Sequence, residues 1–327
     1  MSVSPDQLPA VRKALRAAFG TETLDGWAPL SGGLSGAGLW RIRVGGIAYV
    51  LKVEAAERDA LRDPHRSYRC LKLAAEACLA PRVRYADPDD GVAISDHVEA
   101  RDHAGSRADL VVELAQAARA LHAVEGFPPL VDYLDGLAAL VDRAAGSGTV
   151  AADALARPLA AWARLYEACG RLEPQPVSSH NDLNPRNLLH DGRRVWLIDW
   201  EAAFRADRYV DLAALANVYA ADPAGEALLL RTYFGREANE AERARLYLFR
   251  QVSHVFHAAI FLVGVAGQAR AETLDGPDLD ALHAGLSLGE PLLDTAGGRL
   301  AYGLARWRTA TANVEAAAFE AAVRIAR

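Results

Sequence analysis

The sequence predicts an α+β protein with a small β-rich N-terminal part and a larger helical C-terminal part. Two alternating apolar–polar segments joined by Gly45-Gly46 predict a β-hairpin over residues 40–53, because period-two alternation places every second side chain on one face of a strand. A second hairpin is predicted over residues 83–94. From Ser106 onward apolar residues recur at helical spacing, so we expect helices over most of the remaining chain.

Helices are expected on both sides of each hairpin. Ser4-Pro5 predict a helix start, since a capping residue and a first-turn proline favour one, and a second helix is expected to end at Pro81. Ser106 and Asp109 have capping-box spacing ahead of the next helix. The apolar face of the first helix is formed by Leu8, Val11, Leu15 and Phe19. We expect one short hairpin, over residues 187–200, within the helical part.

The boundary between the two parts is predicted between Asp96 and Ser106. This gives an N-terminal domain of residues 1–99 and a C-terminal domain of residues 100–327. With 327 residues, of which 51% are hydrophobic, the chain is long enough for two domains with buried cores.

Composition limits the partners of the protein. A net charge of −6 argues against a nucleic-acid protein whose affinity depends on a broadly basic surface. Three cysteines without a CxxC pair argue against a disulfide scaffold and a zinc ribbon. No signal peptide is expected, and the longest apolar run, 258–267, is shorter than the roughly 20 residues of a membrane helix. We expect a cytoplasmic protein without nucleic-acid or membrane partners, and its oligomeric state stays open.

Three acidic and amide residues give the clearest chemical pattern. Asp182 and Asn187 are five residues apart on one predicted loop, and Asp199 ends the next apolar strand. Phosphoryl transfer requires a carboxylate near the attacking hydroxyl and oxygen ligands for Mg²⁺. We therefore expect Asp182 to be the catalytic base, or at least the group that orients the hydroxyl, and Asn187 and Asp199 to bind Mg²⁺. A turn and a helix cap would explain each residue alone, but not the three at this spacing.

The motif His-x-Asp-x-x-x-x-Asn followed by Ile-Asp-Trp-Glu resembles the aminoglycoside phosphotransferase and choline/ethanolamine kinase superfamily. The segment Asp-Arg-Tyr-Val-Asp-Leu-Ala at 207–213 extends this resemblance. The resemblance implies a two-lobed, protein-kinase-like fold that binds ATP and Mg²⁺. It also implies that His180 braces the catalytic loop and that Asp211 is a buried carboxylate that fixes the loop backbone.

A glycine-rich stretch at residues 31–38 precedes the first hairpin strand. Glycines let backbone N–H groups approach phosphates closely, although most glycine clusters are ordinary loops and this one lacks the Walker pattern. Its position is informative because Lys52, one of only three lysines, follows on the partner strand. A strand lysine can also simply face solvent. The residues expected to contact the ATP phosphates are Ser31, Gly32, Gly33, Ser35, Gly36 and Lys52.

Two further positions concern the nucleotide. The superfamily pairs the phosphate-binding lysine with a glutamate on the following helix, but the positions in the best register, Ser67 and Tyr68, are not acidic. Asp96, His97 and Val98 end an apolar strand and are expected to offer backbone groups to adenine. A plain strand end explains those three residues equally well.

Two sets of residues are candidates for binding the acceptor. Trp200 and Glu201 would suit an ammonium group such as that of choline, because aromatic faces and carboxylates attract cations. Arg250, His254 and His257 share one face of a late helix and would suit an anionic or polyhydroxy acceptor better. A partly solvated face, or core histidines with hydrogen-bond partners, would explain the same spacing.

We expect an ATP- and Mg²⁺-dependent kinase that phosphorylates a hydroxyl group of a small molecule. Choline- or ethanolamine-like acceptors rank first, aminoglycosides second and a metabolite unlike either third. Two other classes stay open: a nucleotide-binding pseudokinase that acts as an interaction module, and a magnesium-dependent phosphohydrolase.

Overall fold

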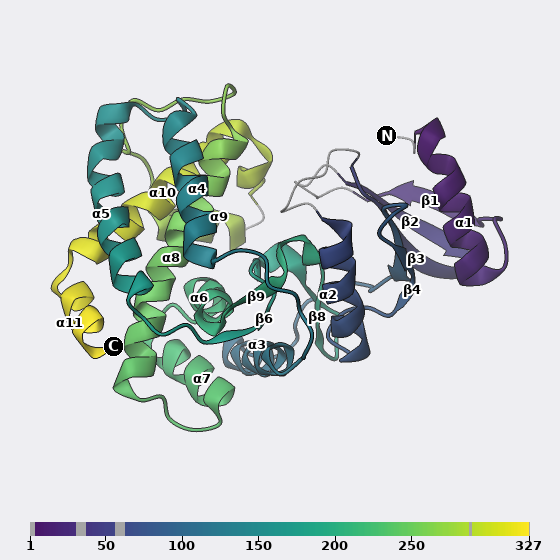
Figure 1. Cartoon of the computed structure of the whole chain (residues 1–327), viewed down its shortest axis with the longest axis horizontal. Coiled ribbons are helices and arrows are strands. Elements are labelled where there is room, and N and C mark those ends of the chain that lie inside the picture. The colour runs from purple at the N-terminus through teal and green to yellow at the C-terminus, as the bar shows by residue number, and fades with distance from the viewer. Residues whose placement is uncertain (1–3, 31–36, 56–62, 288–289, 327) are drawn as a thin grey trace. The chain divides into compact units, whose positions relative to one another are not determined.

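The computed structural model describes residues 4–30, 37–55, 63–287 and 290–326 (Figure 1). The chain forms two compact units. Unit 1 comprises Met1–Leu130, Pro176–Asp211 and Val218–Gly235, and unit 2 comprises Val131–Gln175, Leu212–Asn217 and Arg236–Arg327. The predicted α+β class is confirmed, with a five-stranded antiparallel sheet and many helices. The predicted domain boundary near residue 99 stays a prediction.

The sheet of unit 1 has the strand order β1-β2-β3-β5-β4. Its strands are β1 (Gly26–Pro29), β2 (Gly38–Val44), β3 (Ile47–Val53), β4 (Val83–Asp87) and β5 (Val92–Asp96). Both predicted hairpins are confirmed, and Gly45 and Gly46 take φ values of 58° and 78° at the first turn, which glycine adopts at little cost. Strand β1 was not predicted, because four residues are too few to show alternation.

Helix α1 (Leu8–Phe19) covers one part of this sheet. It packs on β4 and β5, and its Val11 and Leu15 join a buried cluster with Ile42, Leu51 and Ile94. Val11, Leu15 and Phe19 of the predicted apolar face therefore pack as expected, whereas Leu8 is 41% exposed. Helix α2 (Pro64–Glu76) lies between the hairpins, as predicted, and is capped by Asp63, but it ends at Glu76 and not at Pro81.

The rest of the described part of unit 1 holds short strands, further helices and the two ends of helix α6 (Arg208–Tyr219). Helix α3 (Arg107–His122) begins with the predicted capping box of Ser106 and Asp109 and packs against α7 (Pro223–Phe234). The hairpin predicted over residues 187–200 is confirmed as β7 (Leu188–His190) and β8 (Val195–Leu197), but it is not the only strand pair in this part of the chain. A second pair, β6 (Pro176–Ser179) with β9 (Phe204–Asp207), was missed because each strand has four residues. Helix α6 (Arg208–Tyr219) follows β9.

Unit 2 is helical in its described residues. Its main helices are α4 (Tyr133–Gly146), α5 (Ala152–Gly170), α8 (Glu240–Gly264), α9 (Leu279–Ser287), α10 (Ala296–Glu315) and α11 (Ala317–Ile325). Helix α8 packs against α4, α5, α10 and α11 and so forms the core of the unit (Figure 1). By length and composition α8 is apolar enough to cross a membrane, although 61% of its most apolar window is buried, as in the core helix of a globular unit.

Candidate active site

The loop between β6 and β7 is fixed by the carboxylate of Asp211. Its two oxygens accept hydrogen bonds from the backbone N–H groups of His180 (2.9 Å) and Asn181 (2.8 Å). Asn181 has a φ of 64°, a left-handed conformation that asparagine tolerates better than most residues. Burial raises the pKa of Asp211. Its hydrogen bond with His122 and the neighbouring imidazoles and backbone N–H groups lower the pKa by more, so the net shift is downward. Asp211 is therefore a buried carboxylate stabilised in its charged form.

His180 connects this loop to the end of β8. Its Nε2 lies 2.9 Å from the carbonyl oxygen of Ile198, and since a carbonyl only accepts, Nε2 carries the proton. The imidazole also lies against the ring of Trp200, at a centroid distance of 4.7 Å. His180 thus holds the loop beside the segment that carries Asp199.

The carboxylate of Asp182 is oriented by two side-chain amides. Asn184 donates to its Oδ1 at 2.9 Å, and Asn187 donates to its Oδ2 at 3.0 Å. Asn187 also donates to the backbone carbonyl of Asp182 at 2.9 Å. Burial raises the pKa of Asp182, and the hydrogen bond from Asn184 opposes this increase. The arrangement gives an oriented carboxylate whose proton affinity is higher than usual, as a general base requires.

Asn187 and Asp199 have the oxygen atoms that Mg²⁺ prefers. Because the amide nitrogen of Asn187 faces Asp182, its Oδ1 points elsewhere and accepts no hydrogen bond from the described residues. Asp199 has a φ of 64°, is accessible to solvent, and likewise receives no hydrogen bond from that part of the chain. Its pKa is raised by burial, which the positive charge of Lys52 opposes. An accessible carboxylate and a free amide oxygen fit a Mg²⁺ ion.

Lys52 pairs with two carboxylates, neither of which lies on α2. Its Nζ donates to Oε1 of Glu201 at 2.5 Å and lies 3.2 Å from Oε1 of Glu54. Burial lowers the pKa of Lys52, but Glu54, Glu201 and Asp199 together raise it above the usual value. The glutamate sought on α2 is therefore replaced by glutamates from the end of β3 and from the segment after β8.

Arg66 was not predicted as a site residue. This side chain on α2 is 5% exposed, and its Nη1 and Nη2 donate to the carbonyl oxygens of Ala203 (2.5 Å) and Glu201 (2.7 Å). Helix α2 therefore contacts the Asp199–Glu201 segment through a basic residue next to the positions where a glutamate was sought. The feature that could have indicated Arg66 is that this arginine lies on the face of α2 that is otherwise buried.

The predicted nucleotide contacts are only partly described. Ser31, Gly32, Gly33, Ser35 and Gly36 lie outside the described residues. The side chain of Asp96 is bound by Arg84 at 2.6 Å, and the N–H of His97 donates to the carbonyl of Ala48 at 3.3 Å. Val98 follows without regular secondary structure. The N–H of His97 is thus already used within the sheet, so adenine would need another backbone group.

The two predicted acceptor-binding residues near Asp199 are engaged within unit 1. Trp200 is 4% exposed and packs against His180 and Phe127, and Glu201 holds Lys52. A buried indole and a paired carboxylate do not form an open site for an ammonium group.

The second predicted set lies on α8 in unit 2. Arg250 donates through Nε to Oδ1 of Asn217 at 2.9 Å, and His257 shares a hydrogen bond between Nδ1 and the carbonyl of Ser253 at 2.8 Å. Burial lowers the pKa of His257 to about 3 and that of the 5%-exposed His254 well below 6.5, so both imidazoles are neutral. The set therefore combines one cationic side chain with two uncharged imidazoles.

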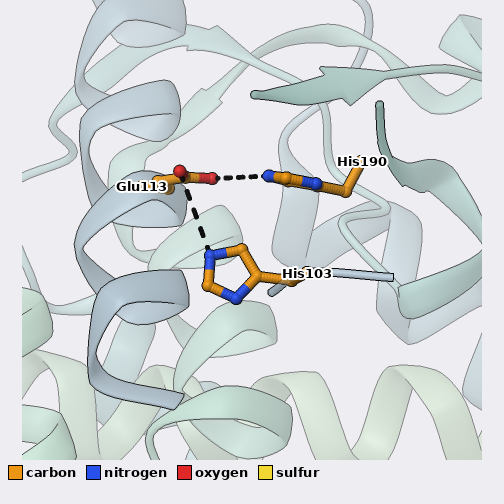
Figure 2. A group of neighbouring side chains, drawn as sticks. All are labelled: His103, Glu113 and His190. Atoms are coloured by element: carbon orange, nitrogen blue, oxygen red, sulfur yellow. Dashed lines mark ion pairs between the residues drawn. The ribbon is translucent and has the colours of Figure 1, made fainter. Parts of the chain in front are cut away.

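A further group of titratable side chains, His103, Glu113 and His190, was not predicted. Figure 2 shows Glu113 on α3 facing both imidazoles, with Oε2 3.3 Å from Nε2 of His190 and Oε1 4.0 Å from Nε2 of His103. The spacing resembles a metal site, but the N–H of Gly192 donates to Nδ1 of His190 at 3.0 Å. Neutral His190 must then carry its proton on Nε2, which leaves no lone pair for a metal there.

Several solved structures have a similar fold. A choline/ethanolamine kinase family protein from Mesorhizobium loti is 21% identical, with a TM-score of 0.69, and the match covers 98% of this chain and 99% of that chain. The choline kinase LicA from Streptococcus pneumoniae is 15% identical (TM-score 0.66; 94% and 99% covered). The streptomycin–ATP–APH(2")-IIa ternary complex is 16% identical (TM-score 0.56; 92% and 99% covered). At these identities the likeness concerns the fold alone.

The sequence itself matches a family. No curated protein sequence is significantly similar to the chain. The model of the phosphotransferase enzyme family (APH) matches residues 26–249, which include Lys52, Asp182, Asn187 and Asp199 and more than half of the 327 residues. The chain therefore belongs to the phosphotransferase enzyme family, as a small-molecule phosphotransferase.

Proposed function

We propose that the enzyme transfers the γ-phosphoryl group of ATP to a hydroxyl group of a small molecule, with Mg²⁺ bound by Asn187 and Asp199. The observation that carries this proposal is the orientation of the Asp182 carboxylate by Asn184 and Asn187, next to a solvent-accessible Asp199. An oriented base beside free oxygen ligands is the arrangement that phosphoryl transfer from a nucleotide needs.

The reaction follows from these positions. The acceptor oxygen attacks the γ-phosphorus of ATP, its bond to phosphorus forms, and the bond from that phosphorus to the β–γ bridging oxygen breaks, so ADP leaves. The hydroxyl proton passes to the carboxylate of Asp182 and from there to solvent. Mg²⁺, when bound, neutralises charge on the phosphate oxygens. His180 and Asp211 keep the loop in place during the transfer.

Lys52 supplies the positive charge for the ATP phosphates. Its ammonium is held by Glu54 and Glu201, and the raised pKa keeps it protonated at neutral pH. A compact ammonium on a flexible stem can turn toward phosphate oxygens without losing both carboxylates. This placement supports a nucleotide site beside Asp199.

Choline- and ethanolamine-like amino alcohols are the first acceptors to test, because similar solved structures are choline or ethanolamine kinases. Aminoglycosides come second, since a similar structure is a streptomycin–ATP complex of APH(2")-IIa. The same ATP complex supports ATP as the phosphoryl donor.

The test is acceptor-dependent formation of ADP by wild type and by Asp182→Asn. We expect the variant to lose about 10³-fold in turnover, a typical contribution of a general base, while ATP binding measured by calorimetry is retained. Asp89→Asn, on an exposed turn of unit 1, is the matched control and should behave like wild type. Near-normal turnover of Asp182→Asn would refute the assignment. ATP binding without ADP formation for any acceptor would favour the pseudokinase alternative.

A further inference from the structure

Tyr233 on α7 begins a chain of hydrogen bonds that ends at the loop between β6 and β7. Its hydroxyl lies 2.7 Å from Nδ1 of His122, and Nε2 of the same imidazole lies 3.1 Å from Oδ2 of Asp211. That oxygen also accepts the backbone N–H of His180 at 2.9 Å, and Oδ1 accepts the N–H of Asn181 at 2.8 Å. Asn181 directly precedes the proposed base, and all of these groups belong to unit 1.

The three side chains of this chain of hydrogen bonds are buried. Tyr233 is 4% exposed, and the side chains of His122 and Asp211 are 3% and 0% exposed. Because a buried polar atom without a hydrogen-bond partner destabilises a fold, both nitrogens of His122 need their partners. Loss of the Tyr233 hydroxyl would leave Nδ1 buried without the partner that it has in the structure.

The positions of the protons follow from the charge of Asp211. The lowered pKa of Asp211 keeps its carboxylate charged at neutral pH, so it only accepts, and Nε2 of His122 carries a proton. Nδ1 of a neutral imidazole then accepts, and the hydroxyl of Tyr233 donates to it. Burial raises the pKa of Tyr233 to about 12 against the charge of Arg208, so the hydroxyl keeps its proton at neutral pH. Since the same hydroxyl can accept from a charged imidazole, Tyr233 satisfies Nδ1 in both protonation states of His122.

Arg208 holds Tyr233 from the start of α6. Its guanidinium donates a hydrogen bond to the hydroxyl of Tyr233 and lies 5.9 Å from the centre of the phenol ring. Arg208 and Asp211 are three residues apart on α6 and therefore share a helix face. Tyr233 and His122, whose ring centroids are 5.4 Å apart, thus connect two residues of that face. A rotation of either ring would break this connection.

We propose that Tyr233 is a positioning residue of the phosphoryl transfer. Through His122 it orients the carboxylate of Asp211, which in turn holds the backbone N–H groups directly before Asp182. This inference rests on the proposed function, because it takes Asp182 as the base. Without the hydroxyl the His122 imidazole loses one of its two partners, so Asp211 and the loop are held less firmly. Tyr233 acts on the orientation of the base and not on the reacting atoms.

Amide hydrogen exchange of the full chain tests whether Tyr233 holds the loop. Wild type, Tyr233→Phe and Tyr85→Phe are compared at constant pH, at the loop between β6 and β7 and at strand β3. Tyr85→Phe is the matched control, because it also removes a phenolic hydroxyl of unit 1, which donates to Asp87 at 3.2 Å. We expect the amides of His180 and Asn181 to exchange about tenfold faster in Tyr233→Phe, the effect of losing one buried hydrogen bond. Exchange in β3 should not change, whereas a merely structural role would speed exchange in β3 and in the loop alike.

Turnover tests the consequence for the reaction. We expect the kcat for acceptor-dependent ADP formation to fall about tenfold in Tyr233→Phe, because the base is correctly oriented for a smaller fraction of the time. The KM for ATP and ATP binding measured by calorimetry should not change, since the chain of hydrogen bonds leads to the loop that carries the base and not to Lys52. Tyr85→Phe should match wild type in all three quantities.

His122→Phe shows whether Tyr233 acts through the imidazole, because phenylalanine keeps a ring but neither nitrogen. We expect His122→Phe to lose at least as much kcat as Tyr233→Phe. In the His122→Phe background, Tyr233→Phe should cause no further loss. If His122→Phe does not fold, the exchange and turnover of Tyr233→Phe decide alone.

The inference and the proposed function fail in different ways. The inference is overturned if Tyr233→Phe leaves the exchange of His180 and Asn181 unchanged, or if it lowers kcat equally with and without the His122 imidazole. Normal ADP formation by wild type would in both cases leave the proposed function intact. If wild type forms no ADP with any acceptor, the proposed function fails, and the role of Tyr233 in turnover fails with it.

Discussion

The ammonium of Lys52 donates a 2.5 Å hydrogen bond to the carboxylate of Glu201, 149 residues further along the chain. Glu201 follows Asp199 by two positions, so this bond ties strand β3 to the segment with the proposed Mg²⁺ ligand. Glu54 supports the same ammonium from the end of β3 at 3.2 Å. Lys52 is thus oriented by carboxylates of the two segments proposed to contact ATP, and not by a residue of α2.

Glu201→Gln should weaken nucleotide binding. The amide keeps the shape of the side chain but loses the charge, and a charge-assisted bond is about 1–2 kcal/mol stronger than a neutral one. We therefore expect the KM for ATP to rise about tenfold, with a smaller change in kcat. Glu54→Gln, the matched control on the longer contact, should raise the KM less. An unchanged KM for ATP in Glu201→Gln would show that this bond does not prepare the lysine.

Arg66→Met should destabilise the segment that carries Glu201 and so impair the orientation of Lys52. Arg66 satisfies the carbonyl oxygens of Glu201 and Ala203 with two Nη groups, and their loss leaves two acceptors without charged donors. We expect a loss of about 2–4 kcal/mol in unfolding free energy, and a raised KM for ATP. Arg66→Lys should restore little, because one ammonium cannot reproduce the two-pronged contact.

A double-mutant cycle shows whether Arg66 acts through Glu201. If Arg66 positions Glu201, the effects of Arg66→Met and Glu201→Gln on the KM for ATP should be clearly less than additive. Additive effects would mean that Arg66 only stabilises the fold.

Local patterns were sufficient for the hairpins over residues 40–53, 83–94 and 187–200, because their information lies within a few residues. Alternation over residues 40–53 and the spacing of Asp182 and Asn187 are visible in sequence. Strands β6 and β9 were not predictable in this way: they have four residues each and pair only because the chain between them returns. Their existence depends on tertiary contacts that no local pattern encodes.

The partners of charged side chains were the least predictable part of the site. Lys52 stands out in the sequence as a candidate, but the carboxylates that pair with it could not be chosen among 42 acidic residues without the fold. The burial of Trp200, which the sequence placed at the acceptor, likewise follows from packing on His180 and Phe127.

Asn184→Ala should move the acidic limb of the pH–rate profile. The Asn184 amide stabilises charged Asp182 by a 2.9 Å hydrogen bond and so lowers a pKa that burial raises above 3.8. Removing the bond raises this pKa further, so a higher pH is needed to deprotonate the base. We expect the limb to shift upward by about one pH unit, the value of one charged hydrogen bond. Asn313→Ala, a control in unit 2, should leave the limb in place, and a downward shift in Asn184→Ala would contradict the role of the amide.

Asp211→Asn should destabilise the protein and flatten the acid side of its stability profile. The buried carboxylate accepts from two backbone N–H groups and from His122, whereas an asparagine has one acceptor oxygen and turns an amide donor toward the other groups. We expect a loss of about 3 kcal/mol in unfolding free energy.

Because the folded pKa of Asp211 lies below its ordinary value of 3.8, the charged group stabilises the fold above that pH. The wild-type contribution is lost as pH falls from 3.8 through the folded pKa. Denaturant unfolding at pH 7 and at several acidic pH values should therefore show the two proteins converging at low pH; a constant difference across this range would show that the charge of Asp211 does not hold the loop.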